Sequence, residues 1–337
     1  MKWYTTDVVT KNKGAFLMSK VFLSAKLPTA TTQILADHHF EVQTYTGNGL
    51  ISHAELLRQV SDIDYLITPL STQVDAEVID AAPHLKLIAN FGAGFNNIDA
   101  AYARTKRIQV TNTPAVSTNS VAEVMIGLML ALSHRIVEGD QQMRTTGFPG
   151  WAPLYFLGHE IAGKTLGIVG FGNIGREVAR KARALAVNVQ YWQPHRLSDP
   201  EERSLGVTYA SFADLVANSD FISINAPQTK ENHHQFDAAI FQQMKATAYL
   251  INVGRGPIVD EAALLTALQQ KEIGGAALDV YEHEPKVTVG LEKLTNVILT
   301  PHIGNATVEA RAAMGTIVAN NVVLVEQGQA AKFIVNG

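Results

Sequence analysis

The chain has 337 residues, a formal net charge of −4, 17% charged residues and no cysteine. This length predicts two domains, and the lack of cysteine excludes disulfides, cysteine metal ligands and a cysteine nucleophile. Because no large block of either charge is present, nucleic acid and anionic membranes are not expected as main partners. For a chain without cysteine, a cytoplasmic location is the default expectation. Soluble proteins have roughly 25% charged residues, so some surface is expected to be hidden between domains or subunits.

The first 17 residues have neither the apolar core nor the cleavage pattern of a signal peptide. Met18 opens the stretch MSKVFLSAKL, a basic start that runs into a strand pattern. We therefore predict that residues 1–17 are an N-terminal extension. A membrane-spanning helix needs about twenty apolar residues. The longest strongly apolar run, Met125–Leu132, is much shorter, so no membrane span is expected.

From Met18 onward, short apolar runs alternate with amphipathic segments. The runs predict strands over Val21–Ser24, Phe40–Gln43, Tyr65–Thr68, Leu87–Asn90 and Gln109–Thr111. The segments between them predict helices over Thr29–Asp37, His53–Ser61, Asp75–Ala82 and Asn97–Arg104. Strands that alternate with helices predict an α/β fold, with a parallel sheet covered by helices on both faces.

The middle of the chain contains SVAEVMIGLMLALSHRI, residues 120–136, which is apolar on nearly every side and predicts one buried helix. A second α/β series follows. Its predicted strands are Thr165–Val169, Asn188–Trp192, Phe221–Asn225, Ala248–Asn252, Gly275–Leu278 and Val297–Thr300. A last helix, rich in Ala and Val, is predicted over Thr307–Glu326.

A glycine-rich loop joins the first strand of this second series to an amphipathic helix. Gly170, Gly172 and Gly175 form G-x-G-x-x-G, and together with Asn173 and Ile174 between the last two glycines they are expected to contact the cofactor. The first glycine permits a tight turn, the second lets the backbone approach a pyrophosphate, and the third lets helix and strand pack closely. The helix N-terminus then offers free N–H groups to the phosphates. The order strand, loop, helix predicts a dinucleotide site.

The next strand ends in YWQPHR, where dinucleotide sites usually carry an acid that binds the adenosine ribose. Gln193 replaces this acid and removes its repulsion of a 2′-phosphate. Arg196, with His195 beside it, can pair with such a phosphate. We therefore expect NADP as the preferred cofactor, with NAD as the alternative if these residues form only a solvated loop.

Three polar residues follow predicted strands in the second half of the chain, namely Arg255, Glu284 and His302. Open α/β sheets bind their ligands at the carboxyl ends of the strands. An arginine there can hold the carboxylate and carbonyl oxygen of a 2-oxo acid. A histidine kept protonated by a glutamate can give its proton to that oxygen as hydride reaches C2. These residues predict an oxidoreductase site.

From the residues alone, Glu282 and Asp279 are equally available as the carboxylate beside the histidine. His233 and His234 are adjacent but lie in the polar loop NHHQ. Since no cluster of His, Asp and Glu has the spacing of metal ligands, no metal is expected.

The motifs GFGNIG, NVGRG, ALDVYEHEP and PHIG occur in an order and spacing that resemble the D-isomer-specific 2-hydroxyacid dehydrogenases. The resemblance extends from Met18 to the C-terminus. It implies two Rossmann-like domains with the active site in the cleft between them, and a homodimer. It also implies a flavodoxin-like substrate-binding domain over residues 18–112 and 306–337, and a dinucleotide-binding domain over residues 113–305.

The resemblance also assigns roles. It makes Arg255, Glu284 and His302 the catalytic residues, and it selects Glu284 as the partner of the histidine. In the loop NFGAGFNN, it implies that the N–H groups of Ala93 and Gly94 bind the substrate carboxylate. It further implies cofactor contacts for Thr118, Ala226, Pro227, Val253, Asp279 and Gly304. Among these, Asp279 is expected to contact the nicotinamide carboxamide.

The segment around Trp151, Pro153 and Leu154 resembles the glyoxylate and hydroxypyruvate reductase branch of the family. There such a segment shapes the substrate pocket, partly across the dimer; the alternative is that Trp151 packs a hinge. A glyoxylate-like 2-oxo acid is thus the expected substrate. The alternatives are an NAD-dependent D-3-phosphoglycerate or bulkier 2-hydroxyacid dehydrogenase, and a dinucleotide-sensing, corepressor-like binding protein.

Overall fold

The computed structural model of the chain describes residues 18–337, so the predicted extension over residues 1–17 lies outside the described part. The described chain forms two compact units. Unit 1 comprises the residues up to Pro114 together with Ala312–Gly337, and unit 2 comprises Ala115–Arg311. The sequence-based domain boundaries fall at residues 112 and 306.

Unit 1 contains a parallel five-stranded sheet in the order β2-β1-β3-β4-β5, the strand order of flavodoxin. The strands are β1 Lys20–Leu23, β2 Glu41–Thr44, β3 Tyr65–Pro69, β4 Leu87–Phe91 and β5 Gln109–Thr111. The helices are α1 Thr29–Asp37, α2 His53–Gln59, α3 Ala76–Asp80 and α4 Ala100–Thr105, with a 3₁₀ turn, η1, at Val60–Asp62. Strands β3 and β4 are buried almost throughout, which explains why they read as continuous apolar runs.

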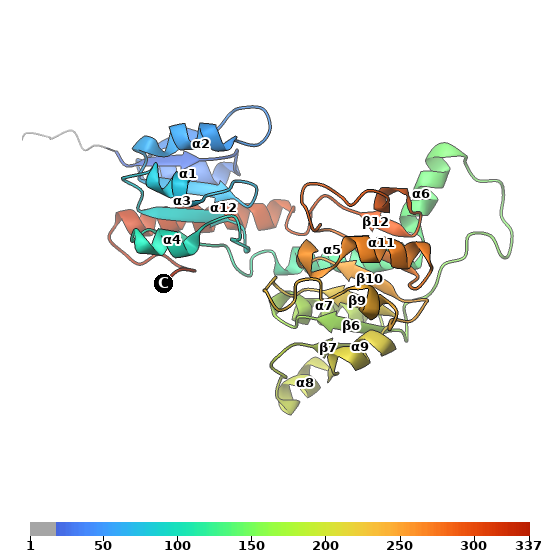
Figure 1. Cartoon of the computed structure of the whole chain (residues 1–337). Helices are drawn as coiled ribbons and strands as arrows, with labels where there is room; N and C mark the ends of the chain where they lie inside the picture. The colour runs from blue at the N-terminus through green and yellow to red at the C-terminus, as the bar shows by residue number, and fades with distance from the viewer. Residues whose placement is uncertain (1–17) are drawn as a thin grey trace, which may run out of the picture. The chain divides into compact units, whose positions relative to one another are not determined.

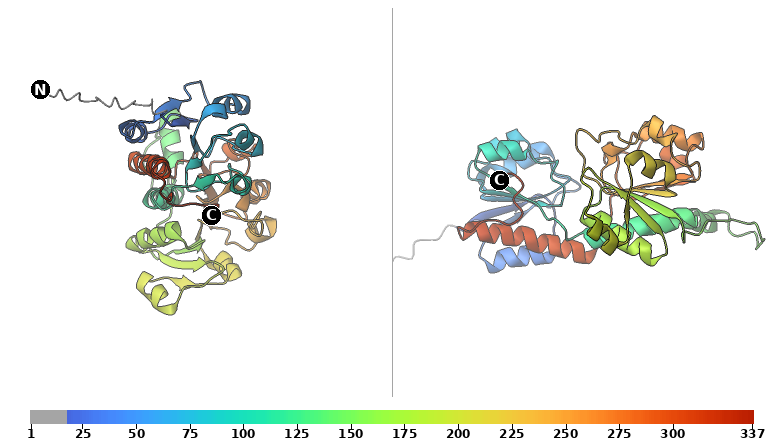
Figure 2. Two further views of the ribbon diagram at one scale, coloured as in Figure 1. Left: turned by 90° about the vertical axis from the view of Figure 1, so that its left-hand side faces the viewer. Right: turned by 90° about the horizontal axis from the view of Figure 1, so that it is seen from below.

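The C-terminal helix α12, Val308–Glu326, returns the chain to unit 1. By length and composition it could cross a membrane, but Met314, Val318 and Val322 are buried, as in a core helix. It lies beside α1 (Figure 2). Any side chain at its Gly315 would collide with Thr31 of α1. Its last residue, Glu326, accepts a hydrogen bond of 2.7 Å from the Tyr65 hydroxyl.

Unit 2 contains a parallel seven-stranded sheet in the order β12-β11-β10-β9-β6-β7-β8 (Figure 1). The strands are β6 Thr165–Val169, β7 Asn188–Trp192, β8 Thr208–Tyr209, β9 Phe221–Ile224, β10 Tyr249–Asn252, β11 Gly275–Leu278 and β12 Val297–Leu299. The order reverses between β6 and β9, and ligands of open α/β sheets bind at such a switch point. The predicted fold class, α/β with two parallel sheets flanked by helices, is therefore confirmed.

The helices of unit 2 cover both faces of this sheet and enclose two apolar cores. They are α5 Thr118–Ser133, α6 Ile136–Thr145, α7 Asn173–Ala184, α8 Asp199–Leu205, α9 Phe212–Asn218, α10 Ala238–Phe241 and α11 Glu261–Gln269, with 3₁₀ turns η2 Gly256–Ile258 and η3 Leu291–Lys293. Helix α5 is buried as predicted, with Met125 and Met129 fully enclosed.

The single helix predicted over residues 120–136 is wrong at its end. Helix α5 stops at Ser133, and Arg135 adopts a left-handed conformation with φ of 56°. The Arg135 side chain then pairs with Glu138, and its guanidinium lies over the Phe156 ring. Helix α6 and the following loop project away from the sheet of unit 2 (Figure 1).

Candidate active site

The three glycines of the dinucleotide loop occupy positions that differ in the space around them. Gly170 has φ of +89°, and a Cβ there would lie 2.6 Å from the backbone N of Ala226. A Cβ at Gly175 would collide with the carbonyl oxygen of Gly170. A Cβ at Gly172 would meet nothing within 4 Å, so the backbone there is open to a bound group.

Helix α7 begins directly after this open backbone. Gly172 is its N-cap and provides no capping side chain, and its first turn, with Asn173 and Ile174, contains no carboxylate. The first N–H groups and the positive end of the helix dipole are therefore available to an anion. These features fit the pyrophosphate of a dinucleotide, because the open backbone and the uncapped helix end coincide.

The end of β7 places Gln193 and Arg196 near each other, but Arg196 is already paired. Gln193 donates a 2.7 Å hydrogen bond to the carbonyl of His195, whose side chain is exposed. Arg196 donates through Nε and Nη2 to the two carboxylate oxygens of Glu202, at 2.8 and 2.9 Å. This bidentate pair raises the pKa of Arg196 and offsets part of its positive charge.

The turn after β10 holds Arg255 in place. The buried side chain of Asn252 donates to the carbonyl of Arg255 at 3.0 Å and accepts from the N–H of Gly254 at 3.0 Å. Gly256 packs so closely on the backbone of Tyr281 that no side chain fits there. Burial lowers the pKa of the Arg255 guanidinium, and the charge of Glu284 acts in the opposite direction. A partly desolvated cation therefore lies within electrostatic range of this carboxylate.

His302 and Glu284 form a direct pair in unit 2. Nδ1 of His302 lies 3.0 Å from Oε2 of Glu284, and the other carboxylate oxygen accepts a 3.1 Å bond from the N–H of Tyr281. Burial acts to raise the pKa of Glu284, but the hydrogen bond and charge of His302, with smaller help from Arg255, lower it overall. Within residues 18–337, Nε2 of His302 has no hydrogen-bond partner. The geometry thus leaves this nitrogen available for proton transfer.

Asp279 holds the loop on which His302 lies. Its carboxylate is almost fully buried and accepts hydrogen bonds from Thr300 Oγ1 at 2.7 Å and from the N–H groups of Ile303 and Gly304 at 2.8 Å each. Ser120 of α5 donates to the Gly304 carbonyl at 2.6 Å. The backbone on both sides of the histidine is therefore fixed. Contact of Asp279 and Gly304 with a nicotinamide stays a prediction.

The loop after β4 in unit 1 presents two backbone amides. Asn90 donates to the carbonyls of Gly92 and Gly94, at 3.0 and 2.6 Å, and Asn112 donates to that of Ala93 at 2.7 Å. The N–H groups of Ala93 and Gly94 have no partner among the described residues. With its carbonyls turned to asparagine side chains, the loop presents donors that suit a carboxylate.

The other predicted contact residues lie at several places in unit 2. Thr118 starts α5, Val253 is buried after β10, and Pro227 is exposed after β9. Trp151 and Leu154 are 81% and 82% exposed, in the projecting segment after α6. Nothing within the described chain packs either side chain into a pocket.

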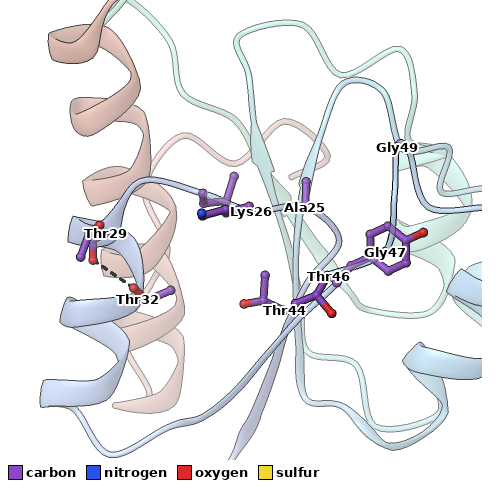
Figure 3. A pocket seen from close by; sticks show the side chains of 10 residues that line it. Ala25, Lys26, Thr29, Thr32, Thr44, Thr46, Gly47 and Gly49 are labelled. Atoms are coloured by element: carbon purple, nitrogen blue, oxygen red, sulfur yellow. Dashed lines mark hydrogen bonds between the residues drawn. The ribbon is translucent and has the colours of Figure 1, made fainter.

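A cavity of about 600 Å³ lies in unit 1, at the carboxyl ends of β1 and β2 (Figure 3). Lys26, Thr44 and Tyr45 are among its lining residues. No predicted site residue lines it, and it offers threonine hydroxyls and one lysine but no acid–base pair. The chemistry therefore points to the His302 pair rather than to this cavity.

Four residues that position the site were missed from the sequence: Asn90, Asn112, Asn252 and Glu202. Asn90 is the penultimate residue of buried strand β4 and Asn252 is the last residue of β10, and a buried polar side chain there is a usable signal. Asn112 directly follows β5, one residue after a buried strand, and carries the same signal in weaker form. Glu202 lies in an acidic helix start, DPEE, which gives no indication of which carboxylate turns inward.

The chain is similar to known proteins over nearly its whole length. Residues 126–304 match the family described as D-isomer specific 2-hydroxyacid dehydrogenase, NAD binding domain. A protein of Staphylococcus haemolyticus, named provisionally as a 2-hydroxyacid dehydrogenase, is 53% identical over 95% of this chain and 100% of its own length.

Solved structures agree with this similarity. A Thermus thermophilus protein is 34% identical, with a TM-score of 0.88 over 94% of this chain and 99% of its own. The NADPH-dependent glyoxylate/hydroxypyruvate reductase of Sinorhizobium meliloti, solved with NADP and malonate, is 30% identical, with a TM-score of 0.79 over 94% and 96% of the two chains. Together with the glycine loop and the His302–Glu284 pair, these similarities establish that the chain belongs to the D-isomer-specific 2-hydroxyacid dehydrogenase family.

Proposed function

We propose that this protein reduces a small 2-oxo acid of the glyoxylate or hydroxypyruvate type to the D-2-hydroxy acid, with a reduced nicotinamide dinucleotide. The observation that carries the proposal is the His302–Glu284 pair, 3.0 Å apart, together with the half-buried Arg255, whose charge acts on Glu284. An imidazole, a carboxylate and a desolvated guanidinium provide the proton donor, its stabilising charge and a binding group for the carbonyl.

When bound, the nicotinamide supplies the hydride that reaches C2 of the substrate. Arg255 then binds the carbonyl oxygen and draws electron density toward it. His302 gives the proton on Nε2 to this oxygen, and Glu284 stabilises the imidazolium before transfer. In the reverse direction the same nitrogen accepts the proton.

We assign the substrate carboxylate to the amides of Ala93 and Gly94. Their lack of any partner within residues 18–337 supports this assignment. The loop NFGAGFNN contains no lysine or arginine, so it offers no cation for a substrate phosphate. This favours glyoxylate or hydroxypyruvate over a phosphorylated hydroxy acid.

For the cofactor we propose that Gly172 and the start of α7 hold the pyrophosphate, with NADPH modestly preferred over NADH. Gln193 supports NADPH, because it places no negative charge near a 2′-phosphate. The similar reductase of Sinorhizobium meliloti is named as NADPH-dependent. The pair between Arg196 and Glu202 acts against a strong preference, because it offsets the charge that would bind the phosphate.

A panel of 2-oxo acids, assayed with NADH and NADPH, tests both parts of the proposal. We expect the highest kcat/KM with glyoxylate or hydroxypyruvate, and a shift toward NADH in Gln193→Asp. Cofactor binding without turnover of any 2-oxo acid would support a dinucleotide-sensing protein instead. A strong wild-type preference for NADH would contradict the assignment of Gln193 alone.

We also propose a homodimer in which the projecting segment after α6 contacts the second copy. Phe148, Trp151, Leu154 and Leu157 are between 53% and 82% exposed there. Four large apolar side chains on one short segment are typical of a surface covered by a partner.

A further inference from the structure

Two histidines and a glutamate meet in unit 2, although 48 residues separate His234 from Glu282. Nε2 of His234 lies 2.7 Å from Oε1 of Glu282, and the ring centroids of His233 and His234 are 4.0 Å apart. One ligand atom from each residue lies within 4.8 Å of the other two. Two ligands on one tetrahedral zinc ion lie about 3.3 Å apart, so small side-chain rotations bring all three atoms onto one ion.

The backbone directs both rings to the same side. His234 has φ of 51°, a left-handed conformation that is uncommon outside glycine and enriched in histidine. In an extended segment, adjacent side chains point in opposite directions, whereas this conformation stacks the two rings. The N–H of His234 donates to the Pro257 carbonyl at 2.8 Å, which holds the loop in this form.

His234 also faces a second carboxylate through its other nitrogen. Nδ1 lies 3.9 Å from Oδ2 of Asp260, while the other carboxylate oxygen of Asp260 caps α11 at Ala263. Histidines that bind metals usually donate their second ring N–H to such a carboxylate, which fixes the tautomer. At 3.9 Å, Asp260 lies just beyond hydrogen-bond distance, so a small rotation of the ring would bring it into this outer position.

The local charge favours a cation. The Glu282 side chain is only 14% exposed, and its backbone N–H donates at 2.7 Å to the buried carboxylate of Glu261. Across residues 18–337, no lysine or arginine forms an ion pair with Glu261, Glu282 or Asp260. Within residues 18–337, the ion pairs of Glu282 and Asp260 are therefore formed with histidines alone.

We propose that His233, His234 and Glu282 bind one divalent transition-metal ion of the zinc class, with Asp260 as the outer partner of His234. Two imidazoles and one carboxylate are a donor set that suits Zn²⁺ or Ni²⁺, with water in the open positions. His283, whose Nε2 lies 3.8 Å from Oε1 of Glu282, is available as a further ligand. This site departs from the sequence-based expectation of no metal, and it is independent of the proposed reductase activity.

The ion would join two loops of the cofactor domain. His233 and His234 follow β9 and the Ala226–Pro227 turn, whereas Glu282 follows β11 and lies two residues before Glu284. Metal binding therefore links the segment predicted beneath the cofactor to the segment that carries the partner of His302. It is expected to raise the melting temperature of the full chain.

Chelator-treated full-length protein titrated with Zn²⁺ in a calorimeter tests the site, with Co²⁺ absorption as a second probe. We expect one zinc ion per chain, and affinity reduced at least about 10-fold in His233→Ala, His234→Ala and Glu282→Gln. The matched control is His39→Ala. His38 and His39 are also adjacent, and His39 also has a positive φ, of 63°, but no clustered carboxylate accompanies them.

His233 is exposed, so its alanine variant keeps the test valid if Glu282→Gln fails to fold. No zinc binding by the wild type would overturn the proposal. So would wild-type affinity in both histidine variants, or an equal loss in His39→Ala. Two results together would also contradict the metal site: a lower melting temperature of metal-free His234→Ala, and no rise in the wild-type melting temperature on addition of zinc. They would show that the cluster stabilises the fold by hydrogen bonds alone.

Discussion

At single residues, the site depends on side chains that hold other groups in place. Asp279 is the clearest example, because three hydrogen bonds join its carboxylate to the loop of His302. In Asp279→Asn, an amide NH₂ faces the N–H of Gly304 or Ile303, and an unpaired buried donor costs about 1–3 kcal/mol of stability. We expect kcat to fall about 10- to 100-fold through misplacement of the histidine.

The ratio of kinetic constants separates this positioning role from a cofactor contact. If Asp279 acts through His302, kcat falls in Asp279→Asn while KM for NADPH changes little. If it chiefly binds the nicotinamide carboxamide, KM for NADPH rises instead. Steady-state kinetics with varied NADPH, together with urea unfolding of both proteins, decides between the two roles.

Glu202 makes stability depend on pH in a defined direction. The bond from Arg196 lowers the pKa of this carboxyl below its ordinary value of 4.5, against the opposing effect of burial. A carboxyl whose pKa is lower in the folded than in the unfolded protein stabilises the fold when it is ionised. For Glu202 this stabilisation is complete above the ordinary pKa of 4.5, and it is lost as the pH falls through the lower pKa of the folded state.

We therefore expect Glu202→Gln to lower the free energy of unfolding at pH 7 and to differ less from the wild type as pH falls from 5 to 3. Urea unfolding of both proteins across this range measures the difference. Asp37→Asn is a matched control, because its carboxylate is exposed and, within residues 18–337, accepts a side-chain hydrogen bond from Gln33 alone. If the difference in the free energy of unfolding between Glu202→Gln and the wild type stays constant down to pH 3, the lowered pKa of Glu202 is contradicted.

At the level of elements, the glycine loop gives a prediction with an internal control. A methyl group at Gly175 collides with the Gly170 carbonyl, whereas one at Gly172 meets open space. We expect Gly175→Ala to lose about 1–3 kcal/mol of stability. Gly172→Ala should fold normally but bind NADPH more weakly, because its methyl group enters the space proposed for the pyrophosphate.

Thermal unfolding and NADPH fluorescence titration of the two variants measure both quantities. If the two variants are equally stable, the close packing of α7 against β6 at Gly175 does not contribute to stability, and the first prediction is wrong. Wild-type affinity in Gly172→Ala would place the pyrophosphate elsewhere.

Most of the elements could be predicted from the sequence because parallel buried strands are short apolar runs between turn residues. Strand β8 has only two residues, Thr208–Tyr209, and gives no such run. The break between α5 and α6 depends on the backbone of Arg135, which is stabilised by Glu138 and Phe156 rather than by a glycine or proline. Local sequence patterns do not report such side-chain contacts.

The meeting of Glu284 with His302 could be predicted because each follows a strand, and parallel strands end at one edge of a sheet. The pairing of Arg196 with Glu202 could not, since the same stretch offers Asp199 and Glu201 as partners. Nor could the meeting of His234 with Glu282, which depends on how the loops after β9 and β11 fold toward each other.

At the level of the whole molecule, the projecting segment predicts a dimer. Light scattering should give a mass near twice the 36.5 kDa of one chain. Replacing Trp151 and Leu154 together by Ser should shift this mass toward the monomer, because the two side chains are 81% and 82% exposed within one chain. Leu50→Ser, at a 66% exposed leucine of unit 1, is the control and should leave the mass unchanged. A monomeric wild type would refute the dimer.

Reduction of a 2-oxo acid with His302 as proton donor is tested most directly by one comparison. NADPH oxidation with glyoxylate and hydroxypyruvate is measured for the wild type and for His302→Gln, together with NADPH affinity by fluorescence. We predict turnover by the wild type, a loss of about 10²- to 10⁴-fold in kcat in the variant, and unchanged NADPH affinity. Near-normal turnover in His302→Gln would contradict the role of this histidine.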